Sequence, residues 1–134
     1  MVLCDNVVTE EELSATLTDM QNGSSPGPDG FTAKFFLVFW TELKELITSA
    51  VNEIFQKGKM PDSFKESIVT LIPKKSRPKT RVSCLRPINL LNVIYKVITK
   101  MLARRISKVI GRIVNEDQTG FVKGRLSAKI LELL

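Results

Sequence analysis

Residues 67–113 read SIVTLIPKKSRPKTRVSCLRPINLLNVIYKVITKMLARRISKVIGRI, and the order of residue types in this stretch predicts the fold. The segment SIVTLIP (67–73) is apolar and β-branched, which is typical of a strand. A basic, proline-containing loop (74–83) follows it, and LRPINLLN (85–92) predicts a second strand whose proline favours an edge or bulged position. Together the two strands predict a β-hairpin with a charged tip.

The stretch after the hairpin has strong helical periodicity and a regular row of cations. The expected apolar face consists of Ile94, Ile98, Leu102, Ile106, Val109, Ile110 and Ile113. The cations Lys96, Lys100, Arg104, Lys108 and Arg112 recur every four residues. Like charges at this spacing repel by roughly 0.2–0.5 kcal/mol per pair, so an anion lying along the row would stabilise the helix. The alternative is an ordinary solvated face opposite a buried one.

The first half of the chain predicts two helices joined by a rigid turn. Thr9 and Glu12 form a capping-box pattern, in which Glu12 reaches back to Thr9, at the start of a helix from about Glu10 to Gln21 that ends at Asn22-Gly23. Residues 24–31, SSPGPDGF, place two prolines and two glycines in a sharp turn, which taken alone indicates a helix connector. Residues 32–61 then predict one long amphipathic helix that ends at Gly58.

Composition restricts the function classes. The length of 134 residues suits one domain or a piece of a larger one. Because 43% of the residues are hydrophobic and the mean hydropathy is +0.04, we expect a folded core. The chain has no histidine and only two cysteines, Cys4 and Cys84, which excludes a Cys/His zinc site and any Ser-His-Asp mechanism. There is no apolar run long enough to span a bilayer and no secretory signal, so we expect an intracellular protein of the nucleus or cytoplasm, without a membrane partner.

Positive charge is concentrated in the second half of the chain. The net charge is +6, yet residues 1–56 hold nine acidic and two basic residues. Between Glu66 and Glu116 there are twelve Lys and Arg and no acidic residue. A single-sign block in a foldable stretch predicts a polyanionic partner, RNA or DNA; the alternative is a chance surface bias.

The hairpin loop is the densest part of this block. It holds Lys74, Lys75, Arg77, Lys79 and Arg81, and Arg86 begins the next strand. A basic tip beside a fixed arginine predicts a phosphate clamp, because arginine offers a forked and permanently charged set of donors. The alternative is a charged loop that protects the sheet edge from aggregation.

Five motifs in order closely resemble the N-terminal part of the reverse transcriptase of LINE-type (non-LTR) retrotransposons. They are SPGPDGF, FFLVFW, GKMPDSFKESIVTLIPKK, LRPINLLNVIYKVITKMLARRI and DQTGFVKGR, and they cover about residues 9–126. The resemblance implies an α+β, mostly helical fingers-type subdomain of a right-hand polymerase with one β-hairpin, leading into the palm. It also implies that SSPGPDGF is a rigid elbow at the template path.

The resemblance assigns a nucleotide-binding role to the hairpin. Lys74 and Lys75 stand where the IPK strand of the family enters the fingertip. Arg86 stands in the RPI motif, where the arginine is expected near the triphosphate of the incoming nucleotide. The family usually has an aromatic residue before RPI, whereas Leu85 stands here, and the fingertip connection is short. These two departures affect the expected fingertip geometry.

Template contacts are expected at two places. Gln118, Gly120 and Phe121 match the Q-x-G-F motif, which the resemblance places beside the template. Arg104 and Lys108, from the cation row, are expected to contact template phosphates.

The palm motifs of the family are absent from this sequence. Family members hold two Mg²⁺ ions with aspartates of F-x-D and Y-x-D-D segments, whereas this chain has no Asp-Asp pair and its last aspartate is Asp117. We therefore predict no catalytic residue, no metal ligand and no cofactor in this chain, with Mg²⁺ belonging to the intact polymerase. Residues 1–134 would be a partial reverse transcriptase domain that is inactive alone and lacks its palm and thumb partners.

Two alternatives and one physical consequence accompany this interpretation. The chain could instead be a repurposed nucleic-acid-binding module, or a non-functional retrotransposon remnant. Because both strands are apolar at most positions, a hairpin without a palm would leave an exposed patch. We therefore expect self-association or poor solubility.

Overall fold

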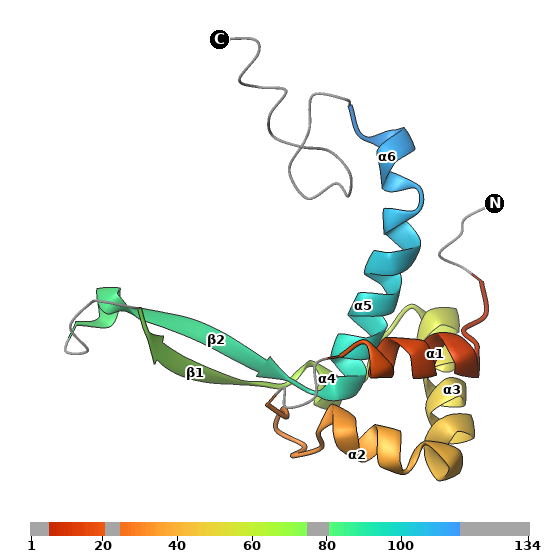
Figure 1. Ribbon diagram of the computed structural model, residues 1–134, viewed down its shortest axis with the longest axis horizontal. Helices are drawn as coiled ribbons and strands as arrows, with labels where there is room; N and C mark the ends of the chain where they lie inside the picture. The colour runs from red at the N-terminus through yellow and green to blue at the C-terminus, as the bar shows by residue number, and fades with distance from the viewer. Residues whose placement is uncertain (1–5, 21–24, 75–80, 116–134) are drawn as a thin grey trace.

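The computed structural model describes residues 6–20, 25–74 and 81–115, which form a helical body and a projecting hairpin (Figure 1). The helices are α1 (Glu10–Thr18), α2 (Ala33–Val38), α3 (Trp40–Lys57), α4 (Asp62–Lys65), α5 (Val93–Ser107) and α6 (Ile110–Ile113), with one 3₁₀ turn, η1 (Val82–Cys84). The strands are β1 (Ser67–Pro73) and β2 (Leu85–Leu91). The predicted α+β class with one hairpin agrees with this architecture.

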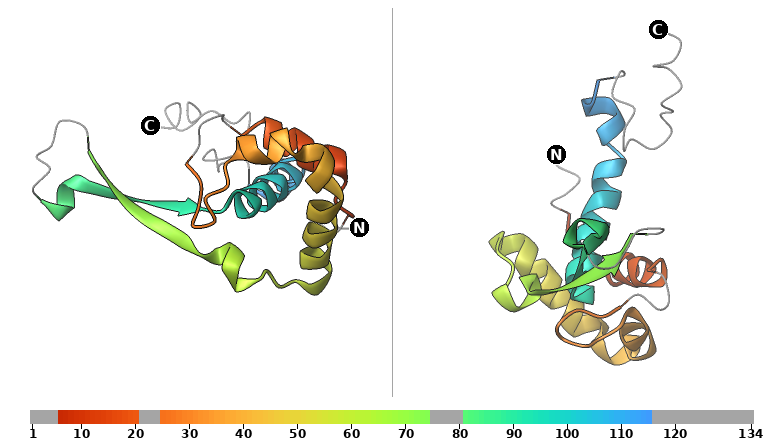
Figure 2. Two further views of the ribbon diagram at one scale, coloured as in Figure 1. Left: turned by 90° about the horizontal axis from the view of Figure 1, so that it is seen from below. Right: turned by 90° about the vertical axis from the view of Figure 1, so that its left-hand side faces the viewer.

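The hairpin pairs its two strands over their whole length. β1 and β2 are antiparallel, with Ser67 opposite Leu91 at the root and Pro73 opposite Leu85 at the far end. Every residue of β1 is exposed to solvent. The left view of Figure 2 shows from a second direction that the hairpin extends away from the helices. The predicted bounds of the first strand are confirmed, and the second strand ends at Leu91, one residue earlier than predicted. Pro87 lies in a strand that has one free edge.

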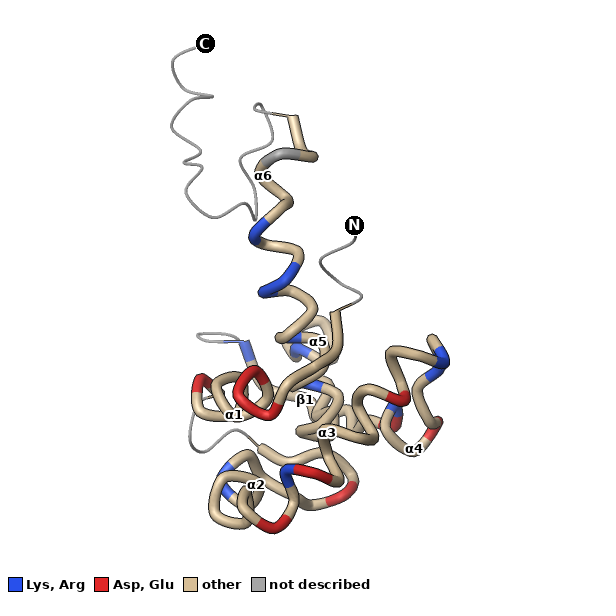
Figure 3. Tube along the Cα trace, turned by 90° about the vertical axis from the view of Figure 1, so that its right-hand side faces the viewer, with Lys and Arg blue, Asp and Glu red and all other residues tan. Residues whose placement is uncertain are grey.

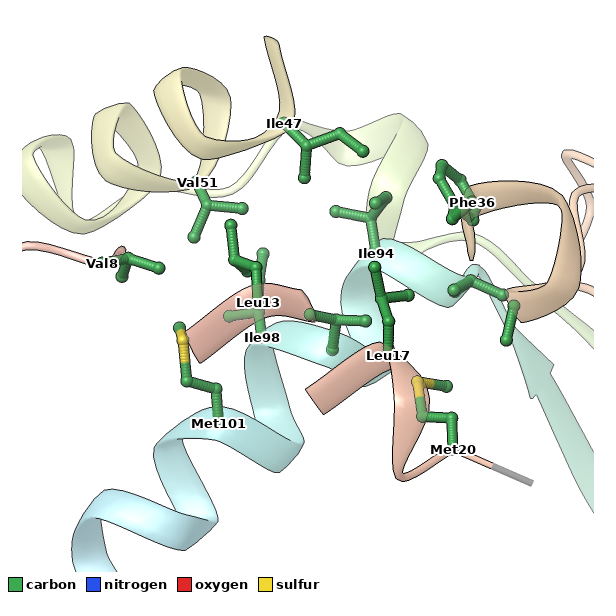
Figure 4. Close-up of a cluster of buried hydrophobic side chains, with 13 residues drawn as sticks. Val8, Leu13, Leu17, Met20, Phe36, Ile47, Val51, Ile94, Ile98 and Met101 are labelled. Carbon is green, nitrogen blue, oxygen red and sulfur yellow. The ribbon is translucent and has the colours of Figure 1, made fainter. Parts of the chain in front are cut away.

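The hydrophobic core lies where α1, α3 and the first half of α5 meet (Figure 4). Leu13 of α1, Val51 of α3 and Met101 of α5 have no exposed surface. Phe36 from α2 closes one side of this core. Burial of these apolar side chains stabilises the body by roughly 1.5–3 kcal/mol per side chain.

Residues 32–58 form two helices, so the prediction of one long helix was wrong. The break lies at Phe39, whose φ of −98° and ψ of 23° are not helical. Phe39 is 46% exposed, whereas Phe36 is buried, so the break lets α2 turn its own apolar side into the core. The predicted end of α3 is confirmed, because Gly58 adopts a left-handed φ of 61° there.

Helix α1 begins as predicted and ends earlier than predicted. The Oγ1 of Thr9 accepts a hydrogen bond from the backbone N–H of Glu12 at 3.3 Å, which confirms the cap. The carboxylate of Glu12, however, pairs with Arg105. The helix ends at Thr18, before the expected Gln21, and the predicted Asn22-Gly23 stop lies outside the described residues.

The helix after the hairpin is also shorter than predicted, and a different set of its residues faces the core. It breaks at Lys108 and Val109 into α5 and α6. Its buried residues are Val93, Ile94, Val97, Ile98, Met101 and Arg105, so only the first part of the expected apolar face is correct. Ile106 and Ile113, expected to be buried, are 43% and 75% exposed. No helix within the described ranges is long and apolar enough to cross a membrane.

Candidate nucleic-acid interface

The far end of the hairpin brings two predicted nucleotide-binding residues together. The backbone N–H of Lys74 donates a 2.8 Å hydrogen bond to the carbonyl of Cys84, so the ladder continues past Pro73. Arg86 lies opposite Ile72, one step nearer the root. Side chains two positions apart in a ladder share a face, so Lys74 and Arg86 lie on the same face of the hairpin.

The two side chains differ in how firmly they are held. The Nζ of Lys74 donates a 2.8 Å hydrogen bond to the carbonyl of Ser83, which draws it back toward the turn. Arg86 is exposed on β2, and no partner for its guanidinium occurs within the described residues. As far as the described residues go, the forked donors of Arg86 are therefore available to an anion.

Four of the predicted site residues lie outside the described residues. They are Lys75 in the hairpin loop and the three residues of the Q-x-G-F motif, Gln118, Gly120 and Phe121. Their expected roles stay predictions.

The cation row on α5 faces the end of α1. Lys100 and Arg104 both pair with the carboxylate of Asp19, at 2.8 and 2.6 Å. Arg104 also donates to Thr16 Oγ1 at 3.1 Å, and Lys96 donates to the carbonyl of Ser25 at 3.0 Å. Figure 3 shows the Lys and Arg positions along α5 beside the acidic residues of α1. The block without acidic residues in the sequence is therefore partly neutralised by α1 in the fold.

Asp19 is the acidic centre of this contact. A hydrogen bond from Lys100, its charge, and the charge of Arg104 hold the pKa of the Asp19 carboxyl below its ordinary value of 3.8. Arg104 can therefore meet a phosphate only by leaving or sharing Asp19. Lys108, one turn further along, is exposed beside a shallow hollow that is also lined by Asn6, Glu12 and Arg105.

Arg105 is a structural residue that the sequence reasoning missed. Its side chain is only 6% exposed, and it pairs with Glu12 through Nε at 2.9 Å and through Nη2. It also donates to the carbonyl of Asn6 at 2.7 Å and lies 5.7 Å from the ring centroid of Phe55. Arg105 stands seven residues after Ile98, on the side of the helix that faces α1. This spacing was the signal from which its burial could have been predicted. This cation joins α5 to α1 and to the segment before α1.

The elbow, residues 25–31 of the proline-rich turn, is packed against the root of the hairpin. A Cβ at Gly27 would lie 2.2 Å from Asn92 Oδ1 and 2.4 Å from the Asn92 backbone nitrogen, so only glycine fits there. Asn92 is 4% exposed; its Oδ1 accepts from the backbone N–H of Asp29, and its Nδ2 donates to the carbonyl of Ser63. One side chain thus joins the elbow, α4 and the junction of β2 with α5.

An apolar hollow lies beside the elbow. It is lined by the aromatic rings of Phe31, Phe35, Phe36 and Phe64 together with Leu43 and Ile94. The rings of Phe31 and Phe35 are 4.6 Å apart, and Phe31 is 45% exposed. Among the described residues, no group of three or more His, Cys, Asp or Glu side chains is placed to hold a metal ion.

Comparison with known proteins identifies the family. No protein-family model matches the chain. It is 35% identical, over 88% of its length, to an uncharacterized 149 kDa protein of transposon TX1 from Xenopus laevis. It is 33% identical, over 63% of its length, to the retrovirus-related Pol polyprotein of the type-1 retrotransposable element R2 from Nasonia vitripennis. Its homologues are LINE-type (non-LTR) retrotransposon proteins.

A third non-LTR relative carries a name that states an activity. It is the probable RNA-directed DNA polymerase of transposon X-element from Drosophila melanogaster, 27% identical over 90% of this chain. These homologues confirm the family that the five motifs indicated. The chain spans only 9%, 8% and 13% of the lengths of the three non-LTR proteins.

Proposed function

We propose that this chain is the fingers region of a LINE-type RNA-directed DNA polymerase, where it contacts the template strand and the triphosphate of the incoming nucleotide. The observation that carries the proposal is the exposed Arg86 beside Lys74, on one face at the free end of a projecting hairpin. A guanidinium held by a strand and open to solvent is suited to bind a phosphate in a forked geometry. The X-element relative, which is named a probable RNA-directed DNA polymerase, supports this proposed role.

The proposal includes no chemistry by this chain alone. Two-metal catalysis needs carboxylates that converge on ions about 3.5–4 Å apart. In the described ranges no three acidic side chains are grouped so as to hold a metal ion, and five of them, Glu10, Glu12, Asp19, Glu53 and Asp62, pair with Lys or Arg. Mg²⁺ would be held by the palm aspartates of an intact polymerase.

The contacts are divided between two regions. Arg86 and Lys74 would bind the triphosphate, together with Lys75. Lys108 is the most accessible of the described template candidates, and Arg104 would contribute after exchanging Asp19 for a phosphate. The Q-x-G-F residues Gln118, Gly120 and Phe121 complete the proposed template side.

Salt-dependent binding tests the proposed nucleic-acid contacts. We expect the chain to bind short single-stranded RNA with little sequence preference, and each phosphate contact to contribute about −0.7 to the slope of log K against log[salt]. Lys108→Gln should make the slope shallower by about 0.7 and weaken all sequences alike. Lys57→Gln is the matched control, because Lys57 pairs with Glu53 on α3. No binding at low salt, or equal effects of the two variants, would contradict the proposal.

Triphosphate binding tests the hairpin separately. We expect a deoxynucleoside triphosphate to protect the wild-type hairpin from a protease that cleaves after lysine and arginine. In Arg86→Gln this protection should be lost. Arg86→Lys keeps the charge but loses the forked geometry, so it should recover only part of the effect. In a primer-extension assay with Mg²⁺ or Mn²⁺ we expect no synthesis by the chain alone. Template-dependent synthesis would overturn this part of the proposal.

A further inference from the structure

The hairpin has a free edge on β1 whose backbone groups can be assigned. The hydrogen bond from the Lys74 N–H to the Cys84 carbonyl fixes which residues face the partner strand. In an antiparallel ladder these residues alternate, so Ile68, Thr70 and Ile72 turn their backbone groups toward β2. The N–H and C=O groups of Ser67, Val69 and Leu71 therefore point outward, and within the described ranges they have no hydrogen-bond partner outside the hairpin.

The two edges of the hairpin are not equivalent. On β2 the outward positions include Pro87, which lacks an N–H, and Leu91, against which the elbow packs at Gly27. On β1 the outward positions Ser67, Val69 and Leu71 carry neither a proline nor a charge, and Pro73 stands only at the free end of the strand. Proline and charge are the usual devices that keep an edge from pairing, so β1 is unprotected from Ser67 to Ile72.

We infer that β1 pairs edge to edge with β1 of a second copy of this chain, which gives a symmetric dimer with a four-stranded antiparallel sheet. The twofold axis would pass midway between the Thr70 residues of the two copies, Thr70 being the central residue of the strand. Val69 of one copy would then lie opposite Leu71 of the other, and Ser67 opposite Pro73. All of the outward N–H groups between Ser67 and Leu71 would meet carbonyls of the second copy.

Charge complementarity at the ends of β1 supports a second copy as the occupant. The register that centres on Thr70 places Glu66 of one copy opposite Lys74 of the other, twice by symmetry. Glu66 is exposed, has extended backbone angles of −62° and 143°, and has no ion-pair partner within the described ranges. The +6 chain would otherwise repel its copy, so a strand without charge that ends in opposite charges is the suitable contact.

The apolar side chains of β1 fit the same arrangement. Ile68 and Ile72 are 47% and 44% exposed on one face, and Val69 and Leu71 are 59% and 53% exposed on the other. In the dimer each would pair across the new ladder with an apolar residue of the second copy. A hairpin of two strands is marginally stable in water, whereas four strands with apolar cross-strand pairs are stable.

Sedimentation velocity of the full chain tests the dimer. Protein concentrations from about 1 to 100 μM cover the range in which a dimer of micromolar Kd dissociates. The decisive pair of variants is Val69→Pro and Asn89→Pro, which remove one outward N–H from β1 and from β2 at directly opposed positions. Neither variant removes a hydrogen bond from the hairpin ladder. We expect Val69→Pro to weaken association at least tenfold and Asn89→Pro to leave it unchanged.

A charge swap tests the register. Glu66→Lys and Lys74→Glu should each weaken the dimer about tenfold, because two attractive cross-strand pairs become repulsive. The double variant should restore wild-type association. Glu45→Lys, an exposed α3 position with the same change in net charge, is the control and should leave the dimer intact. Circular dichroism checks that every variant is folded.

Three results would overturn the inference. The first is a wild-type chain that stays monomeric throughout this range, which would reserve the edge for a strand of another protein. The second is equal behaviour of the two proline variants, which would assign any association to the apolar faces. The third is failure of the charge swap to restore association. None of these results bears on RNA binding, which is measured separately.

Discussion

The helical body and the hairpin use apolar residues in opposite ways. In the body Leu13, Val51 and Met101 are wholly buried between helices from three parts of the chain. In the hairpin every β1 residue is exposed, although Ile68, Val69, Leu71 and Ile72 are as apolar as the residues of the core. The body therefore accounts for the stability of the chain, whereas the apolar surface of the hairpin remains available to a partner.

The largest effect is expected when the same substitution, leucine to alanine, is made in the body and in the hairpin and the free energies of unfolding are compared. Leu13→Ala should destabilise the chain by about 2–5 kcal/mol, because it removes buried methyl groups and leaves a cavity. Leu71→Ala removes the same atoms from a side chain that is 53% exposed and should cost less than about 0.5 kcal/mol. Urea unfolding of both variants at low protein concentration measures the difference. Similar losses would contradict the division into a stable body and an uncovered hairpin.

The second prediction concerns a substitution that disrupts the contact between the elbow and the root of the hairpin. Gly27→Ala should cost about 3 kcal/mol, because its Cβ would lie within 2.6 Å of backbone atoms of Leu91 and Asn92. Gly111→Ala in α6 is the matched control, since a Cβ there meets nothing within 4 Å, and it should be neutral or slightly stabilising. Thermal unfolding of the two variants compares them. A tolerated Gly27→Ala would mean that the elbow is not packed on the hairpin root.

Asn92→Ala tests the same connection with a smaller effect. The substitution leaves the N–H of Asp29 and the carbonyl of Ser63 without their side-chain partner at a site that is 4% exposed. We expect a cost of about 1–2 kcal/mol. Hydrogen exchange should become faster at the hairpin root and in α4, and should remain slow in α1. Uniform acceleration would show that Asn92 supports the whole body equally.

The smallest expected effect is on the stability of the body at low pH, through the carboxylate of Asp19. Because its folded-state pKa is lowered, the Asp19 carboxylate stabilises the fold above its unfolded pKa, and this contribution is lost as pH falls through the folded value. Asp19→Asn should lower the melting temperature at pH 7 and show less acid sensitivity between about pH 5 and 2. Glu42→Gln, at an exposed α3 position, is the control. A constant difference between wild type and Asp19→Asn across this range would contradict the ion pairs.

Local signals in the sequence were sufficient for the hairpin, for the start of α1 and for the end of α3. Thr9 caps α1 and Gly58 ends α3, because capping depends on residues within one turn of each other. The first strand was predicted correctly because its apolar run is rich in β-branched residues, which favour strands, and the second strand follows it across a short basic loop. The break at Phe39 was not predictable, because neither a proline nor a glycine marks it in the sequence.

Contacts distant in sequence explain the rest of the differences. Arg105 is buried because Glu12 and the carbonyl of Asn6, more than ninety positions away, accept its hydrogen bonds. In the same way Asp19 turns Lys100 and Arg104 toward α1. A charge count along the chain cannot include such partners, so the cation row was expected to be more available to an anion than it is. Arg86 was expected only as the fixed arginine of a phosphate clamp, and the structure leaves it exposed on β2.

The attachment of the hairpin at one end makes it a lever. Its root lies at Ser67 and Leu91, and its free end is six residue steps away, a span of about 20 Å. A rotation of about 10° at the root would therefore move the Arg86 region by about 3 Å, several times the 1 Å error that costs an enzyme about a hundredfold in rate. Gly27 and Asn92 fix the pivot, so substitutions there would misdirect a guanidinium that neither residue touches.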